Sequence, residues 1–328
     1  MIKNLKYYLL SLICFGLICS SSAQINQDQV KSFARDLSGR TELSYDQVMA
    51  FIDQAEYQSS IVEKISNPAE KTMTWGRYRN IFMKDERIEA GVDFWNQYSN
   101  VLSDVSADSG VPEEIILGII GVETFFGQRK GGYKVLDALY TLAFGYPKRA
   151  KFFKSELGHF LEIVQKEGLD INEMKGSYAG ALGYCQFMPS SYKAYAKSYD
   201  AGGTKDLVNS PEDAIASVAN YLKVHRWKRG QRTVCEASKS DNAKQLSKQS
   251  LRPKNPVSYY NNLGYKPEAN VSPGSTATLL QLENASGMEY WFGFNNFYVI
   301  TRYNHSELYA MAVIQLAEAI KEKKASIR

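Results

Sequence analysis

The sequence predicts a mainly α-helical protein of the α+β class with a small β-rich insertion, and three observations support this. Apolar residues recur at intervals of three and four along most of the chain before residue 228, as in amphipathic helices. Ser210-Pro211-Glu212-Asp213 is a typical helix start, with a Ser cap, a Pro and two acids. Clusters of Pro, Asn, Ser and Gly separate short alternating runs between residues 232 and 288, which is typical of strands and turns.

The expected elements follow from these patterns in chain order. Residue 112 is a proline suited to a first helical turn, and Gly145-Tyr146-Pro147 separates two further helices. The Gly-rich stretch 176–189 is expected to be a loop or a broken helix, and 297–300 is a patch of β-branched and aromatic residues. Helices are predicted over residues 27–38, 45–55, 85–105, 113–122, 133–144, 148–166, 190–197, 210–227 and 306–322.

The N-terminus has the pattern of a secretory signal peptide over residues 1–23. Lys3 and Lys6 precede an apolar run over residues 7–18 that is too short to span a bilayer, and small residues follow at 21–23. No later segment is long and apolar enough for a transmembrane helix. Beyond the signal we expect an N-terminal helical region, a central core, the β-rich insertion and a C-terminal part of the core, at 24–108, 109–231, 232–291 and 292–328.

Charge and cysteines exclude several classes of partner. The net charge of +4 falls to +2 without residues 1–23, which argues against nucleic acid as a ligand. The three histidines lack the spacing of metal ligands, so no metal site is expected. An isoleucine precedes both Cys14 and Cys19, which disfavours lipid attachment. Cys185 and Cys235 remain in the secreted chain, where an oxidising compartment would permit a disulfide, but the sequence leaves their pairing open.

Glu123 is the first candidate for chemistry. It ends a helix, 113–122, that is apolar on every side and therefore expected to be buried. Desolvation and the negative helix pole both disfavour a charged carboxylate, so we expect a raised pKa, as in a general acid. The alternative is a surface glutamate paired with Arg129 or Lys130. The local sequence leaves both interpretations open.

Three other stretches carry groups suited to binding. In 175–192, glycines 176, 180 and 183 would let a ligand approach the backbone, beside hydrogen-bonding side chains such as Ser177 and Gln186. Residues 295–306 combine several aromatic side chains with Asn304, and Lys148-Arg149 form a basic pair next to a turn. Each stretch also has a structural interpretation: tight packing, a hydrophobic core or a solvated helix start.

Taken together, five motifs resemble the lytic murein transglycosylase B family over about residues 73–320. They are "GIIGVETFFG", "LDALYTLAFGYPKRAKFF", "KGSYAGALGYCQFMPSSYKAYA", "DAIASVANYLKVHRW" and "NNFYVITRYNHSELYAMAV". The resemblance implies a lysozyme-like helical catalytic core that acts on the glycan strands of bacterial peptidoglycan. It places the catalytic acid on Glu123 and substrate-binding roles on Ser177, Gln186, Tyr221, Tyr303, Asn304, Tyr309, Lys148 and Arg149.

Two departures from the family pattern bear on cofactors and on the site. Residues 199–206 lack the alternating oxygen ligands of the calcium-binding loop that many relatives carry, so no cofactor is expected. Cys185 replaces the usual glycine between Tyr184 and Gln186, where its side chain is expected either to narrow the substrate groove or to pair with Cys235.

The resemblance also implies a mechanism. Glu123 would act as the only acid and base in cleaving the bond between N-acetylmuramic acid and N-acetylglucosamine, assisted by the substrate's acetamido group, and would leave a 1,6-anhydro end. The alternatives are a hydrolytic muramidase and a non-catalytic peptidoglycan-binding scaffold. We expect a monomer in the periplasm of a Gram-negative bacterium, in contact with peptidoglycan and other cell-wall enzymes, and anchoring as an outer-membrane lipoprotein is disfavoured.

Overall fold

The computed structural model describes residues 25–66 and 73–327, so the expected signal peptide at 1–23 lies outside the described residues. The described part is mainly helical, with two small sheets, and confirms the predicted fold class. Its helices are α1 (Gln27–Ser38), α2 (Tyr45–Ile52), α3 (Ser59–Ser66), α4 (Trp75–Phe82), α5 (Asp85–Gln97), α6 (Ser99–Ser109), α7 (Glu113–Thr124), α8 (Val135–Gly145), η2 (Pro147–Arg149), α9 (Ala150–Glu167), α10 (Pro189–Tyr195), α11 (Pro211–Val224), α12 (Val257–Asn261), α13 (Asn295–Tyr303) and α14 (Glu307–Ile327).

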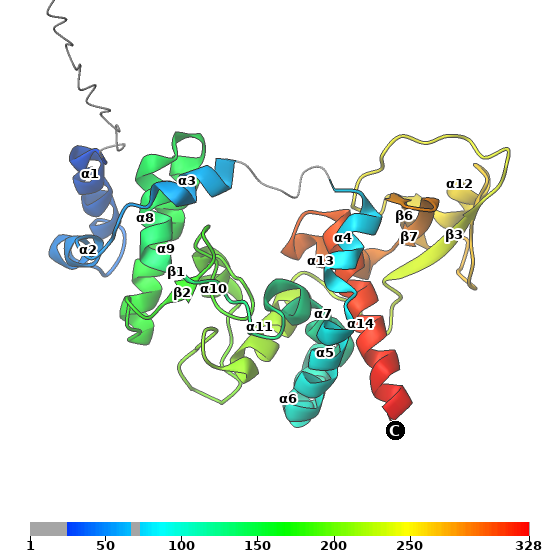
Figure 1. Cartoon of the computed structure of the whole chain (residues 1–328), viewed down its shortest axis with the longest axis horizontal. Coiled ribbons are helices and arrows are strands. Elements are labelled where there is room, and N and C mark those ends of the chain that lie inside the picture. Colours follow the sequence, from blue (N-terminus) through cyan, green and yellow to red (C-terminus); the bar gives the residue numbers. More distant parts are fainter. Residues whose placement is uncertain (1–24, 67–72, 328) are drawn as a thin grey trace, which may run out of the picture.

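The elements form an elongated molecule with helices in the middle and a sheet at one end (Figure 1). Helices α1 and α2 lie beside α8 and α9, where Phe33 packs edge-on against Phe144. Helices α5, α7 and α14 pack together in the centre, and α11 contacts α7. Within the described residues no helix has the length and apolar character needed to cross a membrane.

The larger sheet is antiparallel and lies between residues 234 and 293, within the predicted insertion and its edge. Its strand order is β4-β6-β7-β3-β5, and β6 and β7 form a hairpin that pairs Asn284 with Gly287. On one face Phe292 packs with Tyr260 of α12 in a separate apolar cluster, whereas Leu280 and Trp291 face the main core. Its strands are β3 (Val234–Lys239), β4 (Asn255–Pro256), β5 (Tyr265–Pro267), β6 (Thr276–Asn284) and β7 (Gly287–Gly293).

Several predicted elements differ from the structure in their ends. The helix expected over 85–105 is two helices, because Tyr98 leaves the helical backbone with φ −111° and ψ 27°. The helix expected from residue 133 starts at Val135, since β1 (Tyr133–Lys134) pairs with β2 (Lys175–Gly176). The aromatic patch at 297–300 lies inside α13. The domain boundaries at 108/109, 231/232 and 291/292 stay predictions.

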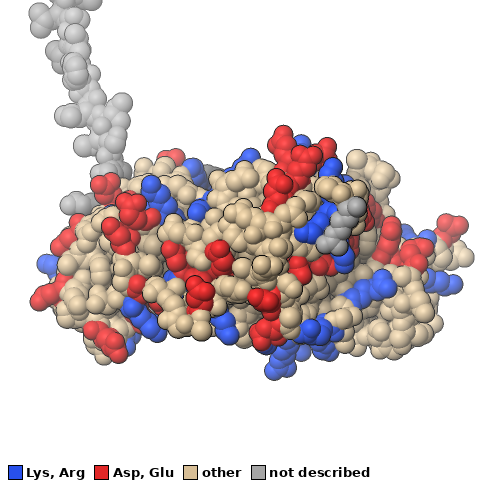
Figure 2. Space-filling model, turned by 90° about the horizontal axis from the view of Figure 1, so that it is seen from below, with Lys and Arg blue, Asp and Glu red and all other residues tan. Residues whose placement is uncertain are grey.

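Charge is spread over the surface. Figure 2 shows Lys, Arg, Asp and Glu side chains along the whole length of one face, so both signs are interspersed there. This distribution fits a chain whose formal net charge is only +4.

Close packing of α7 against α14 sets the geometry of the centre. Helix α7 is buried from Ile115 to Val122, which explains its continuous apolar sequence. Gly118 lies so close to α14 that a Cβ built there would be 2.5 Å from the carbonyl oxygen of Val313 and 3.1 Å from Cβ of Ala317. A larger residue would therefore force the two helices apart.

We expect Gly118→Ala to lower the free energy of unfolding by roughly 1–3 kcal/mol, because the extra methyl group meets backbone that cannot move alone. Gly132→Ala is the matched control, since nothing lies within 4 Å of a Cβ at that position. Urea unfolding followed by circular dichroism measures both. Equal stability of the two variants would contradict the assigned packing.

Candidate active site

Glu123 lies in the last turn of α7 and is half-buried. The hydroxyl of Tyr309, in the first turn of α14, donates a hydrogen bond of 2.6 Å to Oε1 of Glu123. Phe125 and Phe126 follow with φ of 51° and 55°, a left-handed backbone that turns the chain sharply away from the helix. Glu123 is therefore presented at the point where the helix ends.

Two buried or half-buried tyrosines surround this carboxylate. The rings of Tyr303 and Tyr309 stack at 6.3 Å with 12° between their planes, and the Tyr303 hydroxyl donates a 2.6 Å hydrogen bond to the carbonyl oxygen of Cys185. Burial raises the pKa of Tyr309 well above its usual value, and the neighbouring Glu123 raises it further. Burial likewise raises the pKa of Tyr303, with Cys185 and Glu123 adding to the effect. Both phenols therefore stay neutral donors at physiological pH.

The loop at 177–188 is attached to the end of α7 by side-chain hydrogen bonds. The Thr124 hydroxyl lies 3.2 Å from the carbonyl oxygens of Ile120 and Tyr184 and accepts from the amide of Gly127 at 3.1 Å. Gln186 has a left-handed φ of 48°, and its Nε2 donates to the carbonyl oxygens of Lys130 and Gly183 at 3.0 and 2.9 Å. The amide oxygen of Gln186 thus remains an acceptor with a fixed position.

Ser177 organises the turn at the start of this loop. Its hydroxyl oxygen accepts hydrogen bonds from the amides of Ala179 at 3.2 Å and Ala181 at 3.1 Å. In the described part of the chain no protein acceptor takes the hydroxyl proton of Ser177, which is half-buried. Asn304 caps the end of α13 and is exposed. Both side chains can therefore donate to a ligand.

The expectation that glycines 176, 180 and 183 open the backbone to a ligand is wrong. A Cβ on Gly176 would lie 2.1 Å from the carbonyl oxygen of Ala181, and one on Gly183 would lie 1.8 Å from that of Leu207. A Cβ on Gly180 would lie 2.4 Å from Cδ2 of Leu139. The space beside each glycine is filled by the protein itself, so these residues serve tight packing of the loop.

Arg87 modifies the electrostatics expected at the end of α7. This buried residue of α5 donates a 2.7 Å hydrogen bond to the carbonyl oxygen of Gly121, and its guanidinium lies over the ring of Phe125 at 4.7 Å. A cation at this point offsets the negative helix pole. The two proposed surface partners of Glu123 have other contacts: Arg129 lies over Phe125, and Lys130 donates to the carbonyl oxygen of Val208 at 2.6 Å.

Tyr221 does not offer an open face for a sugar, contrary to expectation. It is 7% exposed and stacks on His225 at 4.1 Å, and its hydroxyl donates a 2.5 Å hydrogen bond to the carbonyl oxygen of Arg302. Its ring lies 4.8 Å from Tyr303 and 5.7 Å from Phe187. Tyr221 therefore supports Tyr303 from behind. Burial raises the pKa of Tyr221 to about 12.

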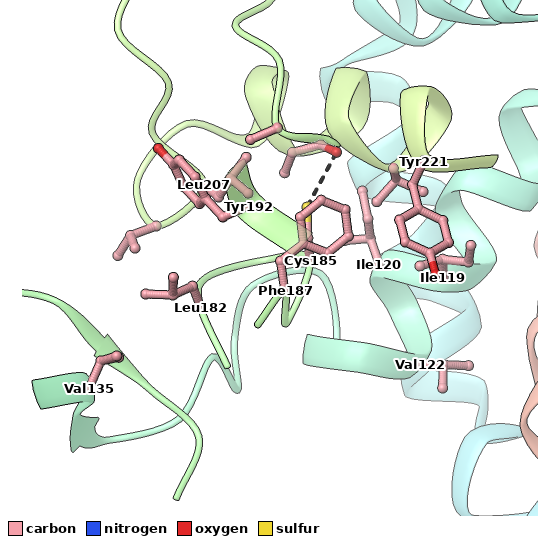
Figure 3. Packing of buried hydrophobic residues seen from close by; sticks show 14 of the residues in the cluster. Ile119, Ile120, Val122, Val135, Leu182, Cys185, Phe187, Tyr192, Leu207 and Tyr221 are labelled. Carbon is pink, nitrogen blue, oxygen red and sulfur yellow. Dashed lines mark hydrogen bonds between the residues drawn. The ribbon is translucent and has the colours of Figure 1, made fainter. Parts of the chain in front are cut away.

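Cys185 is buried and free, and so is Cys235, so the disulfide left open by the sequence is not formed between these described residues. The Cys185 thiol points to α11, where it donates to the carbonyl oxygen of Ala214 at 3.5 Å (Figure 3). Cys235 belongs to the second apolar cluster, behind the sheet. Because Cys185 is fully buried, its side chain does not narrow a substrate groove, contrary to the first alternative.

Lys148 and Arg149 lie in η2, between α8 and α9, and both are exposed. The guanidinium of Arg149 lies over the rings of Phe152 at 4.3 Å and Phe153 at 5.3 Å. In the described residues neither cation shares a hydrogen bond with the group around Glu123. Their proposed contact with substrate stays a prediction.

Carboxylates of the loop at 199–206 and of the following helix α11 accept hydrogen bonds from the backbone of this region. Asp213 accepts from the amides of Tyr199 and Asp206, both at 2.8 Å. Asp206 in turn accepts at 2.9 Å from the amides of Val208 and Asn209 and from Nδ2 of Asn209. These carboxylates hold the backbone of the loop in place, and the absence of a calcium ion stays a prediction.

Sequence reasoning missed three residues that position the site. Arg87 and Thr124 are described above, and buried Glu156 of α9 accepts from the amide and hydroxyl of Ser190, both at 2.8 Å, which fixes the start of α10. Thr124 directly follows Glu123, and that adjacency was a usable signal. Arg87 and Glu156 act from other helices, and nothing in their local sequence indicates these contacts.

A helical core that presents one carboxylate among neutral tyrosines defines a lysozyme-like, glycan-cleaving class of enzyme. Comparison with known proteins agrees: the family model described as "Transglycosylase SLT domain" matches residues 26–318. The chain is 40% identical over 304 residues to membrane-bound lytic murein transglycosylase B of Escherichia coli K12, covering 90% of this chain and 83% of that protein. The chain therefore belongs to the family of lytic murein transglycosylases, which act on peptidoglycan.

Solved structures of two similar proteins have the same fold. Soluble lytic transglycosylase SltB1 from Pseudomonas aeruginosa is 41% identical, with a TM-score of 0.86 over 90% of this chain and 99% of that chain. The Escherichia coli lytic transglycosylase Slt35 in complex with bulgecin A is 40% identical, with a TM-score of 0.84 over 92% of this chain and 95% of that chain. The fold around Glu123 is thus that of the family.

Tyr221→Phe is expected to show a pH-dependent stability difference from the wild type. Below pH 10 the variant should be less stable by about 1 kcal/mol, because the carbonyl oxygen of Arg302 loses its donor. The raised pKa of Tyr221 means that its phenol favours the folded state only while protonated. Stability from this group is full below pH 10 and is lost as the pH rises toward 12.

By pH 11 the free energy of unfolding of the wild type should therefore fall by about 1.4 kcal/mol because of Tyr221, a loss that the Phe variant cannot have. The stability difference between the two proteins should then vanish or reverse. Urea unfolding of both proteins between pH 8 and 11 measures it, and the common loss from other tyrosines cancels in the comparison. A difference that stays constant over this range would argue against a buried, neutral Tyr221.

Proposed function

We propose that this lytic transglycosylase cleaves the β-1,4 bond between N-acetylmuramic acid and N-acetylglucosamine and leaves a 1,6-anhydro end, with Glu123 as its only acid and base. The observation that carries the proposal is the geometry around Glu123. The Tyr309 hydroxyl donates a 2.6 Å hydrogen bond to Glu123, the Tyr303 hydroxyl donates to the carbonyl oxygen of Cys185, and among the described residues neither phenol bonds a second carboxylate. A hydrolytic glycosidase usually has a second carboxylate as nucleophile or base.

In the first step Glu123 protonates the glycosidic oxygen, and the bond from that oxygen to C1 of the muramic acid breaks. The Tyr309 hydroxyl, at 2.6 Å, holds the carboxyl group in place and stabilises the carboxylate that forms. The acetamido oxygen of the same sugar supports the positive charge that develops at C1. Ser177 and Asn304 have the free donors that can orient this group.

In the second step the ionised Glu123 accepts the proton of the 6-hydroxyl group, whose oxygen forms a bond to C1. The anhydro ring closes, the carboxylic acid is restored, and water takes no part. Attack by an internal hydroxyl depends on its being held close to C1. The ring of Tyr303, which is half-buried and stacked on Tyr309, is a flat surface suited to holding a sugar.

The same proposal covers location and assembly. The signal-like sequence at 1–23 favours export to the periplasm of a Gram-negative bacterium. We propose that the enzyme works there on peptidoglycan as a monomer and meets other cell-wall enzymes. Hydrolysis of the same bond and a scaffold without activity are the outcomes that the following experiment separates.

Glu123→Gln should lower the release of anhydro-muropeptides from purified sacculi by at least about 10³-fold, because the amide cannot donate or accept the transferred proton. Binding to sacculi and the melting temperature should be kept. Mass spectrometry of the products measures both rate and chemistry. Products that carry one more water than the anhydro form would replace the proposal with hydrolysis, and an unchanged rate would reject catalysis by Glu123.

Tyr309→Phe should lower kcat about 10- to 100-fold with little change in KM, because its hydrogen bond acts on Glu123 and not on the sugar. Tyr259→Phe, at an exposed tyrosine of α12, is the control and should behave as the wild type. Initial rates on soluble glycan strands measure both. A change in KM alone would mean that Tyr309 binds substrate directly.

A further inference from the structure

A basic cleft lies between the end of α11, the sheet and the start of α13. It is a hollow of about 650 Å³ that no acidic residue lines. Four cationic side chains line it, and in the described residues none of the four forms an ion pair: Arg226, Lys228, Arg232 and Arg252. Asn295, Tyr298 and several hydroxyl groups add neutral hydrogen-bonding groups.

Local sequence concentrates positive charge at this place. Residues 226–254 contain nine Lys or Arg and two Asp or Glu, a surplus of seven in a chain whose total is +4. The rest of the protein is therefore slightly acidic. Four unpaired cations that share one hollow repel one another, so an anionic ligand would be bound there favourably.

The backbone of the cleft is held in a conformation that an arginine does not favour. After α11 the amide of Trp227 donates to the carbonyl oxygen of Leu222 at 3.0 Å, which closes the helix end and leaves Arg226 with a φ of 70°. Glycine is the usual residue at such a position. The arginine there has a conformational cost without a compensating side-chain bond among the described residues, as is common at binding sites.

The loop that carries the cations is attached to the helix that ends at the active site. Buried Asn296 accepts from the amide of Lys228 at 2.9 Å and donates to the carbonyl oxygens of Lys228 and Gln231 at 2.8 and 2.9 Å. Asn295 donates to the carbonyl oxygen of Arg226 at 3.1 Å. From this end α13 runs eight residues to Tyr303, a rise of roughly 12 Å.

A second hollow of about 720 Å³ adjoins the cleft and extends along the segment that follows α13. Arg252 and Tyr298 line both hollows, and the second continues to His305 and Ser306. These two residues directly follow Asn304 and precede Tyr309, the partner of Glu123. The two hollows together therefore extend from the four cations to the residues that follow Asn304, and Glu283 and Glu307 also line the second hollow.

We propose that the basic cleft binds the acidic stem peptide carried by the muramic acid residue of the substrate. This inference rests on the proposed function, because that reaction places a muramic acid beside Glu123. The stem peptide carries free carboxylates, which guanidinium groups bind well. An extended peptide covers about 3.3–3.6 Å per residue, so a stem of four or five residues spans about 13–18 Å, which matches the length of α13.

The double variant Arg226→Gly and Arg252→Gln tests the proposal. Glycine suits the left-handed backbone at residue 226, so Arg226→Gly removes a charge and at the same time removes the conformational cost of that backbone. Anhydro product is measured from two substrates made from the same sacculi: glycan strands with intact stem peptides, and strands stripped by an amidase. We expect the KM of the double variant for intact strands to rise roughly tenfold above that of the wild type. For stripped strands, kcat and KM should both stay within about twofold of the wild-type values.

Lys254→Gln is the matched control, because this exposed cation lies two residues from Arg252 and outside the cleft. It should leave both substrates unaffected. Lys228→Gln removes one cation of the cleft at a position with an ordinary backbone, and it replaces the double variant in the test should that variant unfold. Its KM for intact strands should also rise.

The outcomes separate the two proposals. If the double variant also lost activity on stripped strands, the cleft would bind glycan. If the double variant and the wild type had equal KM values on intact strands, the cleft would bind no part of the substrate. Either result overturns the stem-peptide assignment. A wild-type enzyme that releases no anhydro product from either substrate would instead overturn the proposed function.

Discussion

The hydrogen bond between Tyr309 and Glu123 depends on how closely α7 and α14 approach. Glu123 lies in the last turn of one helix and Tyr309 in the first turn of the other, so their 2.6 Å contact requires a fixed relation between two helix ends. Gly118 lets the helices meet without a side chain between them. Phe126, under Gly121, closes the same interface, since a Cβ there would lie 2.7 Å from its ring. The position of Glu123, the proposed catalytic acid, is thus a consequence of core packing.

Behind this contact the site is a chain of buried aromatic groups with few degrees of freedom. Tyr303 stacks on Tyr309, and Tyr221 lies behind Tyr303. The hydroxyl groups of Tyr303 and Tyr221 both donate to backbone carbonyl oxygens. Groups that are already oriented need not reorganise when charge develops on the substrate, and this lowers the barrier. Arg87 donates to the carbonyl oxygen of Gly121 at the end of α7, and this cation offsets the negative helix pole close to Glu123.

The sequence was sufficient for those features that a single segment determines. The continuous apolar run before Glu123 predicted a buried helix, and the capped start at Ser210 predicted α11. Features that depend on contacts through space were predicted poorly. Whether Gly183 faces a ligand or Leu207, whether Tyr221 shows a face or is covered, and whether Cys185 meets Cys235 or Ala214 depend on segments distant in the chain. Local patterns do not contain these distances.

Helix α13 joins the candidate active site to the basic cleft, because its first residues hold the cationic loop and its last residue, Tyr303, stacks on Tyr309. The three hydrogen bonds of buried Asn296 leave this loop little freedom to move independently of the helix. Arg226 keeps a left-handed backbone that glycine would adopt at lower cost. A residue that is unfavourable for the fold but presents its charge in a hollow without acids is better explained by a ligand than by stability. The geometry of the two sites is therefore set by one rigid element, so a substrate held in both would be aligned along α13 before its bond is broken.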